Sequence, residues 1–181
     1  MISTVSGYTG GDRDGPTYHS LGNHTEAVMV VYDPARVSYP ELLKVFWSAH
    51  DPYGNTNWTQ YRNAVFTTDA AQQAAVAASI QELESHSEQP VSTHVEAAGP
   101  FFAAEDYHQK YLLRQQTHLY RELRHMLPTE AEFLASTAAA RINGYLGGNG
   151  SAEQLRREIG TFGLSPGAQS ELMTAVGVVV R

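Results

Sequence analysis

The sequence predicts an α+β protein, a two-layer sandwich followed by a C-terminal helical extension. Patterns typical of strands and of amphipathic helices are mixed along residues 1–112, which is characteristic of this fold class. The pattern of residues 113–181 is that of several short helices joined by loops. Of the 181 residues, 42% are hydrophobic and 17% are charged, so the chain can bury a substantial core.

Four segments have the pattern of strands. Ile2–Tyr8 is rich in Val, Thr and Ser and stops at the turn signal Gly10-Gly11. His24–Asp33 has apolar residues on both alternations, which is typical of an interior strand covered on both faces. Further strands are predicted at Tyr61–Thr67 and Val91–Ala97.

Helix signals lie between and after these strands. Ser38 and Glu41 have the spacing of a capping box, with a proline between them, and predict a helix that ends near His50-Asp51. Asp69 can cap a second helix, whose apolar stripe is Val76, Ile80 and Leu83. A long helix is predicted from about Ala103 to Met126, and its candidate buried residues are Tyr107, Tyr111, Leu112, Tyr120 and Leu123.

The C-terminal segment has the pattern of several short helices. One begins at Pro128-Thr129-Glu130, an Ala-rich stretch follows at Ala135–Ala140, and a loop is predicted at Asn143–Gly150. Two amphipathic helices are predicted around Ala152–Ile159 and Pro166–Val176. Residues 1–110 carry 13 acidic and 5 basic residues, whereas residues 111–181 carry 6 acidic and 7 basic residues. Because the charge differs in this way, we expect two structural parts. These are a domain at 1–112 and a helical extension at 113–181 that packs on it.

Composition excludes several classes of function. The chain contains no cysteine, which excludes a disulfide framework, a thiolate metal site and a cysteine nucleophile within it. A formal net charge of -7 gives no electrostatic reason to expect a nucleic-acid partner. We expect no membrane partner, because no apolar stretch reaches the roughly 20 residues of a membrane-spanning helix. The start MISTVSGYTGG has neither the basic nor the long apolar region of a signal peptide.

Glu26 is the sharpest candidate for chemistry. It shares a strand face with Val28 and Val30, at the point where an apolar interior begins. Burial there would raise its pKa, so that the carboxyl holds a proton that it can donate. The alternative is a solvated carboxylate at a frayed strand end.

Tyr18 and Tyr61 each lie at the edge of a predicted loop, where a phenol can donate a hydrogen bond to a polar ligand. Packing in the core or at its rim is the alternative for both tyrosines. Residue types that can bind a metal occur at three places, His24-x-Glu26, His50-Asp51 and Glu105–His108. Nothing in their spacing brings three such ligands together. We therefore expect no metal, and we interpret His50-Asp51 as the end of a helix.

Six motifs in order resemble those of the peptide methionine sulfoxide reductase A family. They are GYTGG at 7–11, PTYH at 16–19, GNHTEAVMVVYDP at 22–34, SYPELLKVFWSAHDP at 38–52, TQYRNAVF at 59–66 and AEDYHQKYL at 104–112. The tail containing STAAARINGYLGG resembles the extension of one bacterial-type branch of that family.

The resemblance implies reduction of methionine-S-sulfoxide, free or in a peptide, to methionine, which is a repair of oxidative damage. In the family a cysteine thiolate attacks the sulfur, while a buried glutamic acid and two tyrosines bind and protonate the oxygen. Glu26 matches that acid in H-x-E-A-V, Tyr18 matches the tyrosine of P-T-Y, and Tyr61 matches that of T-Q-Y-R. No cofactor is implied beyond an external thiol, usually thioredoxin, and we expect a cytoplasmic location.

The sequence also departs from the family pattern. The nucleophile belongs to a G-C-F-W-G motif N-terminal to the ISTVSGYTGG region, and its Phe and Trp form the methyl-binding pocket; this chain begins after it. We hypothesise that the natural protein carries roughly 20–30 further residues, enough for a strand and a helix. Without them, a ferredoxin-like reductase core would leave an interior strand edge and an apolar face bare. The loop G-N-D-x-G-T-Q-Y-R becomes Asn55–Arg62, with Thr56 or Asn57 where an aspartate is usual.

We therefore expect this chain to be inactive as it stands, because it has no nucleophile. The alternative is a non-catalytic module that binds methionine sulfoxide through the same pocket.

Overall fold

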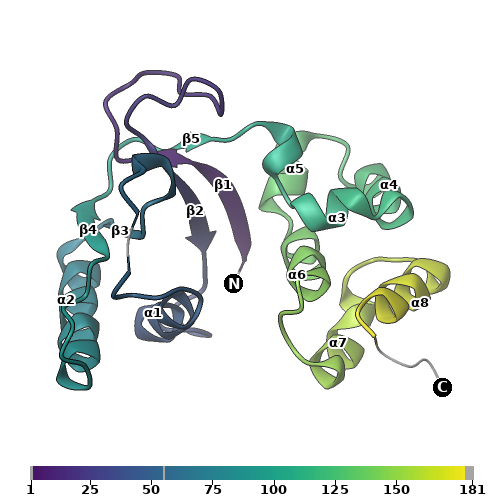
Figure 1. Ribbon diagram of the computed structural model, residues 1–181. Helices are drawn as coiled ribbons and strands as arrows, with labels where there is room; N and C mark the ends of the chain where they lie inside the picture. Colours follow the sequence, from purple (N-terminus) through teal and green to yellow (C-terminus); the bar gives the residue numbers. More distant parts are fainter. Residues whose placement is uncertain (1, 55, 178–181) are drawn as a thin grey trace. The chain divides into compact units, whose positions relative to one another are not determined.

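The computed structural model describes residues 2–54 and 56–177 (Figure 1). These residues form two compact units. The N-terminal unit comprises residues 6–104, and the helical unit comprises the described parts of residues 1–5 and 105–181. The predicted α+β class is confirmed, since strands and helices are mixed in the first unit and helices dominate the second. The predicted domain limit at residue 112 stays a prediction, while the two compact units divide after residue 104.

A three-stranded sheet with the order β2-β1-β5 carries the residues of interest. The strands are β1 (Ser3–Thr9), β2 (Thr25–Val31) and β5 (Phe102–Ala103), so the strand predicted at Ile2–Tyr8 is confirmed. Strands β1 and β5 are antiparallel and pair Gly7 with Ala103. A Cβ at Gly7 would lie 2.3 Å from the Phe101 ring and 2.4 Å from the Phe102 carbonyl oxygen, so only glycine fits there.

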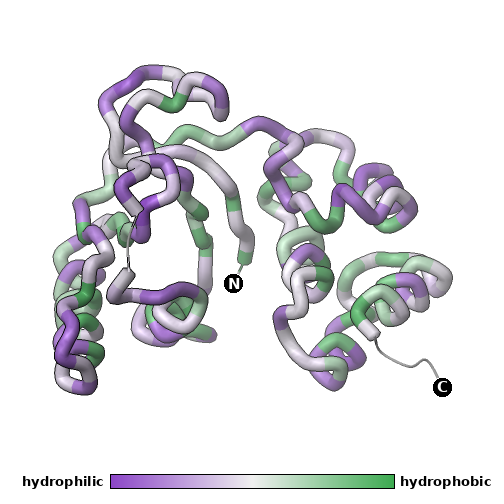
Figure 2. Tube along the Cα trace, in the orientation of Figure 1, coloured by the Kyte–Doolittle hydropathy of each residue, from purple (hydrophilic) through white to green (hydrophobic). Residues whose placement is uncertain are grey.

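The prediction that the second strand is an interior strand is wrong. Strand β2 lies at the end of the sheet in the described residues, and Figure 2 shows hydrophobic residues along it. Val28 is 62% exposed and Val30 38%, while Met29 and Val31 on the other face are 42% and 40% exposed. The residue pattern fits a strand covered on both faces, but in the described chain the side chains of both faces are only partly covered. Strand β2 therefore presents apolar side chains and an unpaired edge among the described residues.

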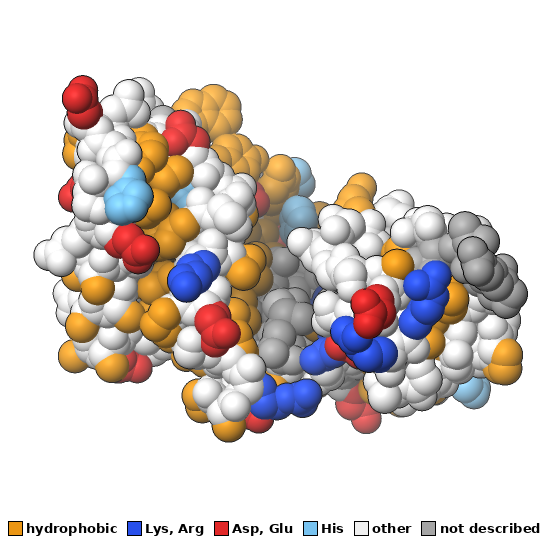
Figure 3. Space-filling model, turned by 90° about the horizontal axis from the view of Figure 1, so that it is seen from below, with side chains coloured by type: hydrophobic (Ala, Val, Ile, Leu, Met, Phe, Trp, Pro, Cys, Tyr) orange, Lys and Arg blue, Asp and Glu red, His pale blue; other side chains and the backbone are white. Residues whose placement is uncertain are grey.

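Two helices and a second, two-stranded sheet complete the N-terminal unit. Helix α1 (Tyr39–Ser48) starts with the predicted capping box of Ser38 and Glu41, and helix α2 (Ala70–Ser85) is capped by Asp69. Strands β3 (Ala64–Thr67) and β4 (His94–Ala97) pair in parallel. A core of this part comprises Leu43, Trp47, Val65 and Val76. Seen from below, hydrophobic side chains also form a band on the surface of this unit (Figure 3).

The long helix predicted from Ala103 to Met126 is wrong. The segment is divided into a 3-10 turn η2 (Asp106–His108), helix α3 (Tyr111–Gln115) and helix α4 (Thr117–Met126). Lys110 has a φ of 50°, in the left-handed region, and Gln116 has a ψ of 83°, and neither conformation continues a helix. As a result Tyr107, Tyr111 and Leu112 are 52%, 57% and 38% exposed, whereas Leu123 is buried as predicted.

The helical unit has its own core. Its further helices are α5 (Glu130–Ala135), α6 (Thr137–Leu146), α7 (Ala152–Glu158) and α8 (Pro166–Ala175), with a 3-10 turn η3 (Ile159–Thr161) between the last two. Leu113, Leu119, Phe133, Ile142 and Leu172 are fully buried together. The loop predicted at Asn143–Gly150 starts later than expected, because α6 runs to Leu146. Nowhere in the described residues does a helix combine the length and apolar character needed to cross a membrane.

Candidate functional site

The hydroxyl groups of Tyr18 and Tyr61 meet at the surface of the N-terminal unit. Their oxygens are 3.4 Å apart, although the residues are 43 positions apart in the sequence. Tyr18 follows the turn that Thr17 and Ser20 close, and its ring packs against the buried residues Tyr8 and Leu21. The ring of Tyr18 packs at the rim of a small core, which is one of its two predicted alternatives, and the role of its hydroxyl as a donor to a ligand stays a prediction.

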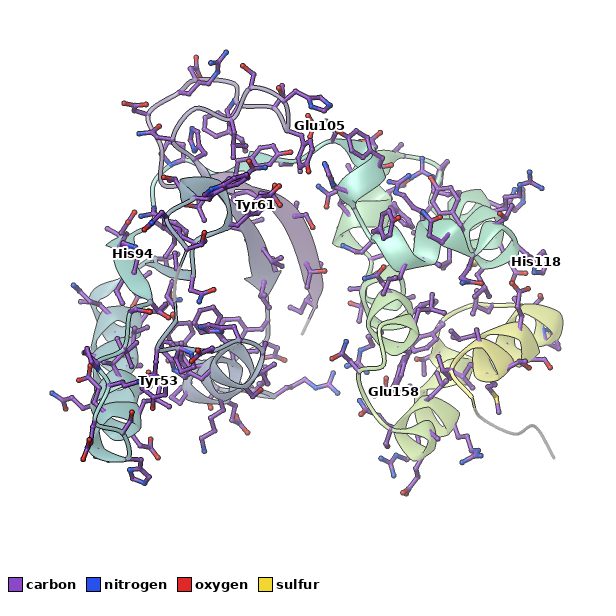
Figure 4. The ribbon with its side chains drawn as sticks, in the orientation of Figure 1. Tyr53, Tyr61, His94, Glu105, His118 and Glu158 are labelled. Atoms are coloured by element: carbon purple, nitrogen blue, oxygen red, sulfur yellow. The ribbon has the colours of Figure 1, made fainter. Side chains whose placement is uncertain are left out.

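Tyr61, which is labelled in Figure 4, ends the short 3-10 turn η1 (Thr59–Tyr61), and this turn lies close to β2. Buried polar contacts hold this turn in place. Thr25, which is 1% exposed, donates from its hydroxyl to the Thr59 carbonyl at 3.1 Å and accepts from Arg62 Nε at 2.8 Å. Arg62 also donates to both carboxylate oxygens of Glu96, at 2.6 and 3.0 Å. A bidentate pair of this kind fixes both position and orientation, so Tyr61 is fixed relative to the start of β2.

His24 has a structural role and not that of a metal ligand. It is 1% exposed, its Nδ1 accepts from the Gly11 backbone N–H at 3.2 Å, and its Nε2 donates to the Arg13 carbonyl at 2.8 Å. Both ring nitrogens are therefore engaged. A Cβ at Gly11 would lie 2.6 Å from the His24 backbone nitrogen, so the glycine is required for this close approach.

Glu26 lies on β2 next to these anchors, and its side chain is exposed. The predicted burial of Glu26 is thus wrong, for the same reason as for Val28 and Val30 on its strand face. Its Oε1 accepts a hydrogen bond from Gln60 Nε2 at 2.7 Å. Gln60 precedes Tyr61 in the η1 turn, so the contact joins the carboxylate to the segment that carries the second tyrosine.

The neighbours of Tyr61 affect the titration of its hydroxyl. The pKa of Tyr61 is raised above its ordinary value of 10.0, chiefly by the hydrogen bond with Tyr18, then by desolvation and by the negative charges of Tyr18 and Glu26. The Tyr61 phenol therefore keeps its proton at neutral pH and can donate it in a hydrogen bond. The cluster of Tyr18, Glu26, Gln60 and Tyr61 is here called the oxygen site.

The other candidate groups are not brought into this cluster. His50 Nδ1 lies 2.9 Å from the Phe46 carbonyl oxygen at the end of α1, as the helix-end interpretation predicts. Its Nε2 lies 3.3 Å from the Thr93 hydroxyl. No three His, Asp or Glu side chains among residues 2–54 and 56–177 are placed to hold a metal ion.

Sequence reasoning missed two residues of this surface, Gln60 and Trp58. Trp58 starts the η1 turn, is 69% exposed and stacks on the Tyr61 ring with 6.2 Å between ring centroids. Gln60 lies inside the T-Q-Y-R motif, so its position beside a candidate tyrosine was the available signal. Asn55, the first residue of the altered loop motif, lies outside the described residues.

Comparisons with known proteins agree with the motifs. The pattern of a family described as "Peptide methionine sulfoxide reductase" matches residues 1–141. A peptide methionine sulfoxide reductase of Drosophila melanogaster is 38% identical over 170 residues, covering 92% of this chain and 67% of that protein. Peptide methionine sulfoxide reductase MsrA of Azotobacter vinelandii is 45% identical over 125 residues, covering 62% of this chain and 58% of that protein.

A solved structure shows the same relationship. The reduced form of Mxr1 from Saccharomyces cerevisiae aligns with a TM-score of 0.58 and 25% identity, covering 62% of this chain and 71% of that one. The chain spans 58% to 61% of the length of bacterial relatives such as those from Azotobacter vinelandii and Klebsiella pneumoniae. With its motifs, its fold and a family match over residues 1–141, the chain belongs to the peptide methionine sulfoxide reductase A family.

Proposed function

We propose that this chain binds methionine-S-sulfoxide, free or in a peptide, by its oxygen and provides the proton-donating part of its reduction to methionine. The observation that carries the proposal is the 3.4 Å separation of the Tyr18 and Tyr61 hydroxyl oxygens. Two phenols this close can both donate to one acceptor oxygen that lies to one side of the pair, within hydrogen-bond distance of each hydroxyl. A sulfoxide oxygen is such an acceptor, with two lone pairs and a strong dipole.

Glu26 is proposed as the proton donor, a role that requires its protonated form, which loss of water around the carboxyl on sulfoxide binding would favour. It is positioned by Gln60 at 2.7 Å and is close enough to Tyr61 to act on it electrostatically. Protonation makes the sulfoxide oxygen a better leaving group, so a carboxyl beside the two phenols lowers the barrier to S–O cleavage. Overall, a sulfoxide and two thiols give a thioether, a disulfide and water, and the thiols supply the two electrons.

This chain contributes no thiolate to that reaction, because it has no cysteine. The thiolate has to come from outside these 181 residues, and family resemblance suggests thioredoxin as the final reductant and a cytoplasmic repair role. We therefore expect no turnover by the chain alone with dithiothreitol or thioredoxin. The absence of cysteine also favours a second candidate, a non-catalytic module that binds oxidised methionine without reducing it.

Binding is the property that tests the proposal in the chain as it stands. In calorimetric titration we expect N-acetyl-methionine-S-sulfoxide methylamide to bind more tightly than its R epimer and than the unoxidised thioether. Tyr18→Phe and Tyr61→Phe should each weaken binding of the sulfoxide about 2- to 10-fold, the effect of one lost hydrogen bond. Tyr111→Phe is the matched control, since Tyr111 is an exposed tyrosine of the helical unit. Equal affinity for sulfoxide and thioether would exclude the oxygen site.

A second experiment separates the two candidates. We expect the chain extended with a family G-C-F-W-G segment to reduce the S-sulfoxide, and Glu26→Gln in that protein to lose most of its rate. A folded extended protein that binds the sulfoxide without reducing it would favour the binding module. An unchanged rate in the Glu26→Gln variant would remove Glu26 from the mechanism.

A further inference from the structure

Trp58 is an exposed aromatic side chain whose position is fixed by the turn that also carries Tyr61. Its backbone N–H donates to the Thr56 hydroxyl at 3.2 Å, and its carbonyl accepts from the Tyr61 backbone N–H at 3.0 Å. It is 69% exposed, whereas the only other tryptophan of the sequence, Trp47, is 9% exposed. Trp58 is therefore exposed although its backbone is fixed by hydrogen bonds.

The indole is continuous with the oxygen site. It stacks on the Tyr61 ring at a centroid separation of 6.2 Å and an angle of 21° between the ring planes. Offset stacking of this kind is a favourable aromatic arrangement. Exposure increases from 48% at Tyr61 to 69% at Trp58, so the stack extends from the hydroxyl pair towards solvent.

We infer that Trp58 forms a subsite for an aromatic or large aliphatic side chain next to the oxidised methionine in a peptide. The inference rests on the proposed function. When the sulfoxide oxygen lies between the two phenols, the peptide backbone and the neighbouring residues lie on the solvent side, where the indole is exposed. A flat, apolar surface there gains most from a side chain that can stack on it or cover it.

The charges around the stack favour this occupant over an acidic one. Arg62, the cation nearest in sequence, has its guanidinium engaged by the Glu96 carboxylate and the Thr25 hydroxyl. Glu26 lies close enough to Tyr61 to raise its pKa. An acidic side chain next to the oxidised methionine would be repelled by Glu26, and Arg62 is already paired and would not offset that repulsion. An apolar side chain meets no such repulsion and only has to leave water.

A peptide series tests the subsite. The reference is Ser-Ser-Met(S-sulfoxide)-Ser-Ser, and the other peptides carry Phe or Lys in place of the Ser on either side of the oxidised residue. We expect at least one Phe peptide to bind about 2- to 10-fold more tightly than the reference, the range of one aromatic contact. Trp58→Ala should abolish that gain and Trp58→Phe should retain most of it, where the gain is the ratio of the affinities for the Phe and reference peptides measured within each variant.

Indole N–H resonances give a second readout without altering the core tryptophan. In the ¹⁵N-labelled protein, Trp58→Phe identifies the Trp58 resonance by its loss. We expect the Phe peptide to shift that resonance much more than that of Trp47, whose Nε1 donates to the Ser79 hydroxyl at 3.0 Å in the interior.

Three results would overturn the inference while leaving the proposed function intact. These are equal affinities for the Ser and Phe peptides, a Phe gain that persists in Trp58→Ala, and a Lys peptide that gains as much as the Phe peptide. The proposed function fails separately, if the reference sulfoxide peptide binds no better than its unoxidised form.

Discussion

Lys110 makes the stability of the helical unit vary with pH in the alkaline range. The residue is 4% exposed, and its ammonium donates to the Thr4 carbonyl. The pKa of Lys110 is lowered from 10.5 to about 8, chiefly because the residue is buried; Glu130 opposes this shift and Arg114 adds to it. We predict that, above pH 8, the free energy of unfolding of the unaltered chain rises relative to that of the Lys110→Met variant.

The sign follows from proton binding in the two states. In the folded protein Lys110 releases its proton near pH 8, whereas in the unfolded chain it does so near 10.5. Between these values the unfolded chain binds more protons, so the free energy of unfolding rises with pH. The contribution from Lys110 is about 1 kcal/mol by pH 9 and about 2–3 kcal/mol by pH 10 relative to pH 7.

Urea unfolding at pH 7, 8, 9 and 10 measures this effect. Lys110→Met keeps a long side chain but has no proton to lose. The tyrosines that also titrate in this range contribute equally to both proteins, so their contribution drops out of the difference in unfolding free energy. Parallel pH dependences for the two proteins would refute the reasoning, because they would mean that Lys110 has the same pKa folded and unfolded.

Three further predictions concern the core, a helix cap and the oxygen site. Val76→Ala should lower the free energy of unfolding by about 2 kcal/mol, because Val76 is 0% exposed, whereas Val28→Ala at 62% exposure should cost about 0.5 kcal/mol or less in urea unfolding. Thr129→Ala should cost about 1 kcal/mol by the same measurement, since its hydroxyl caps α5 by accepting from the Glu132 backbone N–H. Tyr18→Phe should lower the pKa of Tyr61 towards 10.0, because it removes the largest cause of the shift, and ¹³Cζ NMR titration of Tyr61 checks this.

Local signals predicted the helices of the N-terminal unit well. Both α1 and α2 begin where a side chain accepts from the backbone N–H three residues later, at Ser38 and at Asp69. A cap depends only on residues within one turn, so its pattern is visible in sequence. The prediction of one long helix failed because the chain breaks twice, at the left-handed Lys110 before α3 and at Gln116 between α3 and α4. Neither lysine nor glutamine is a residue type that gives warning of such a break.

Burial of β2 could not be predicted from its own residues. Alternating apolar side chains at Val28 and Met29 indicate that both strand faces suit an interior, but whether an element covers them depends on the rest of the fold. The exposure of Glu26 follows from the same cause. The approach of Tyr18 to Tyr61 likewise joins loops 43 residues apart, and only the ordered family motifs pointed to their shared role.

The oxygen site combines exposed reacting groups with buried polar anchors. Glu26 and Tyr61 reach solvent, yet each is adjacent in sequence to a buried anchor, at Thr25 and Arg62. Arg62 Nε joins the two anchors through the Thr25 hydroxyl at 2.8 Å, so β2 and η1 are tied together beneath the surface. The geometry of the hydroxyl pair therefore depends on these contacts at the start of β2 and not on the exposed apolar face beyond it. A chain whose β2 is partly exposed over Val28–Val31 can in this way still hold the two tyrosine hydroxyls in a defined arrangement, which the proposed binding of a sulfoxide oxygen requires.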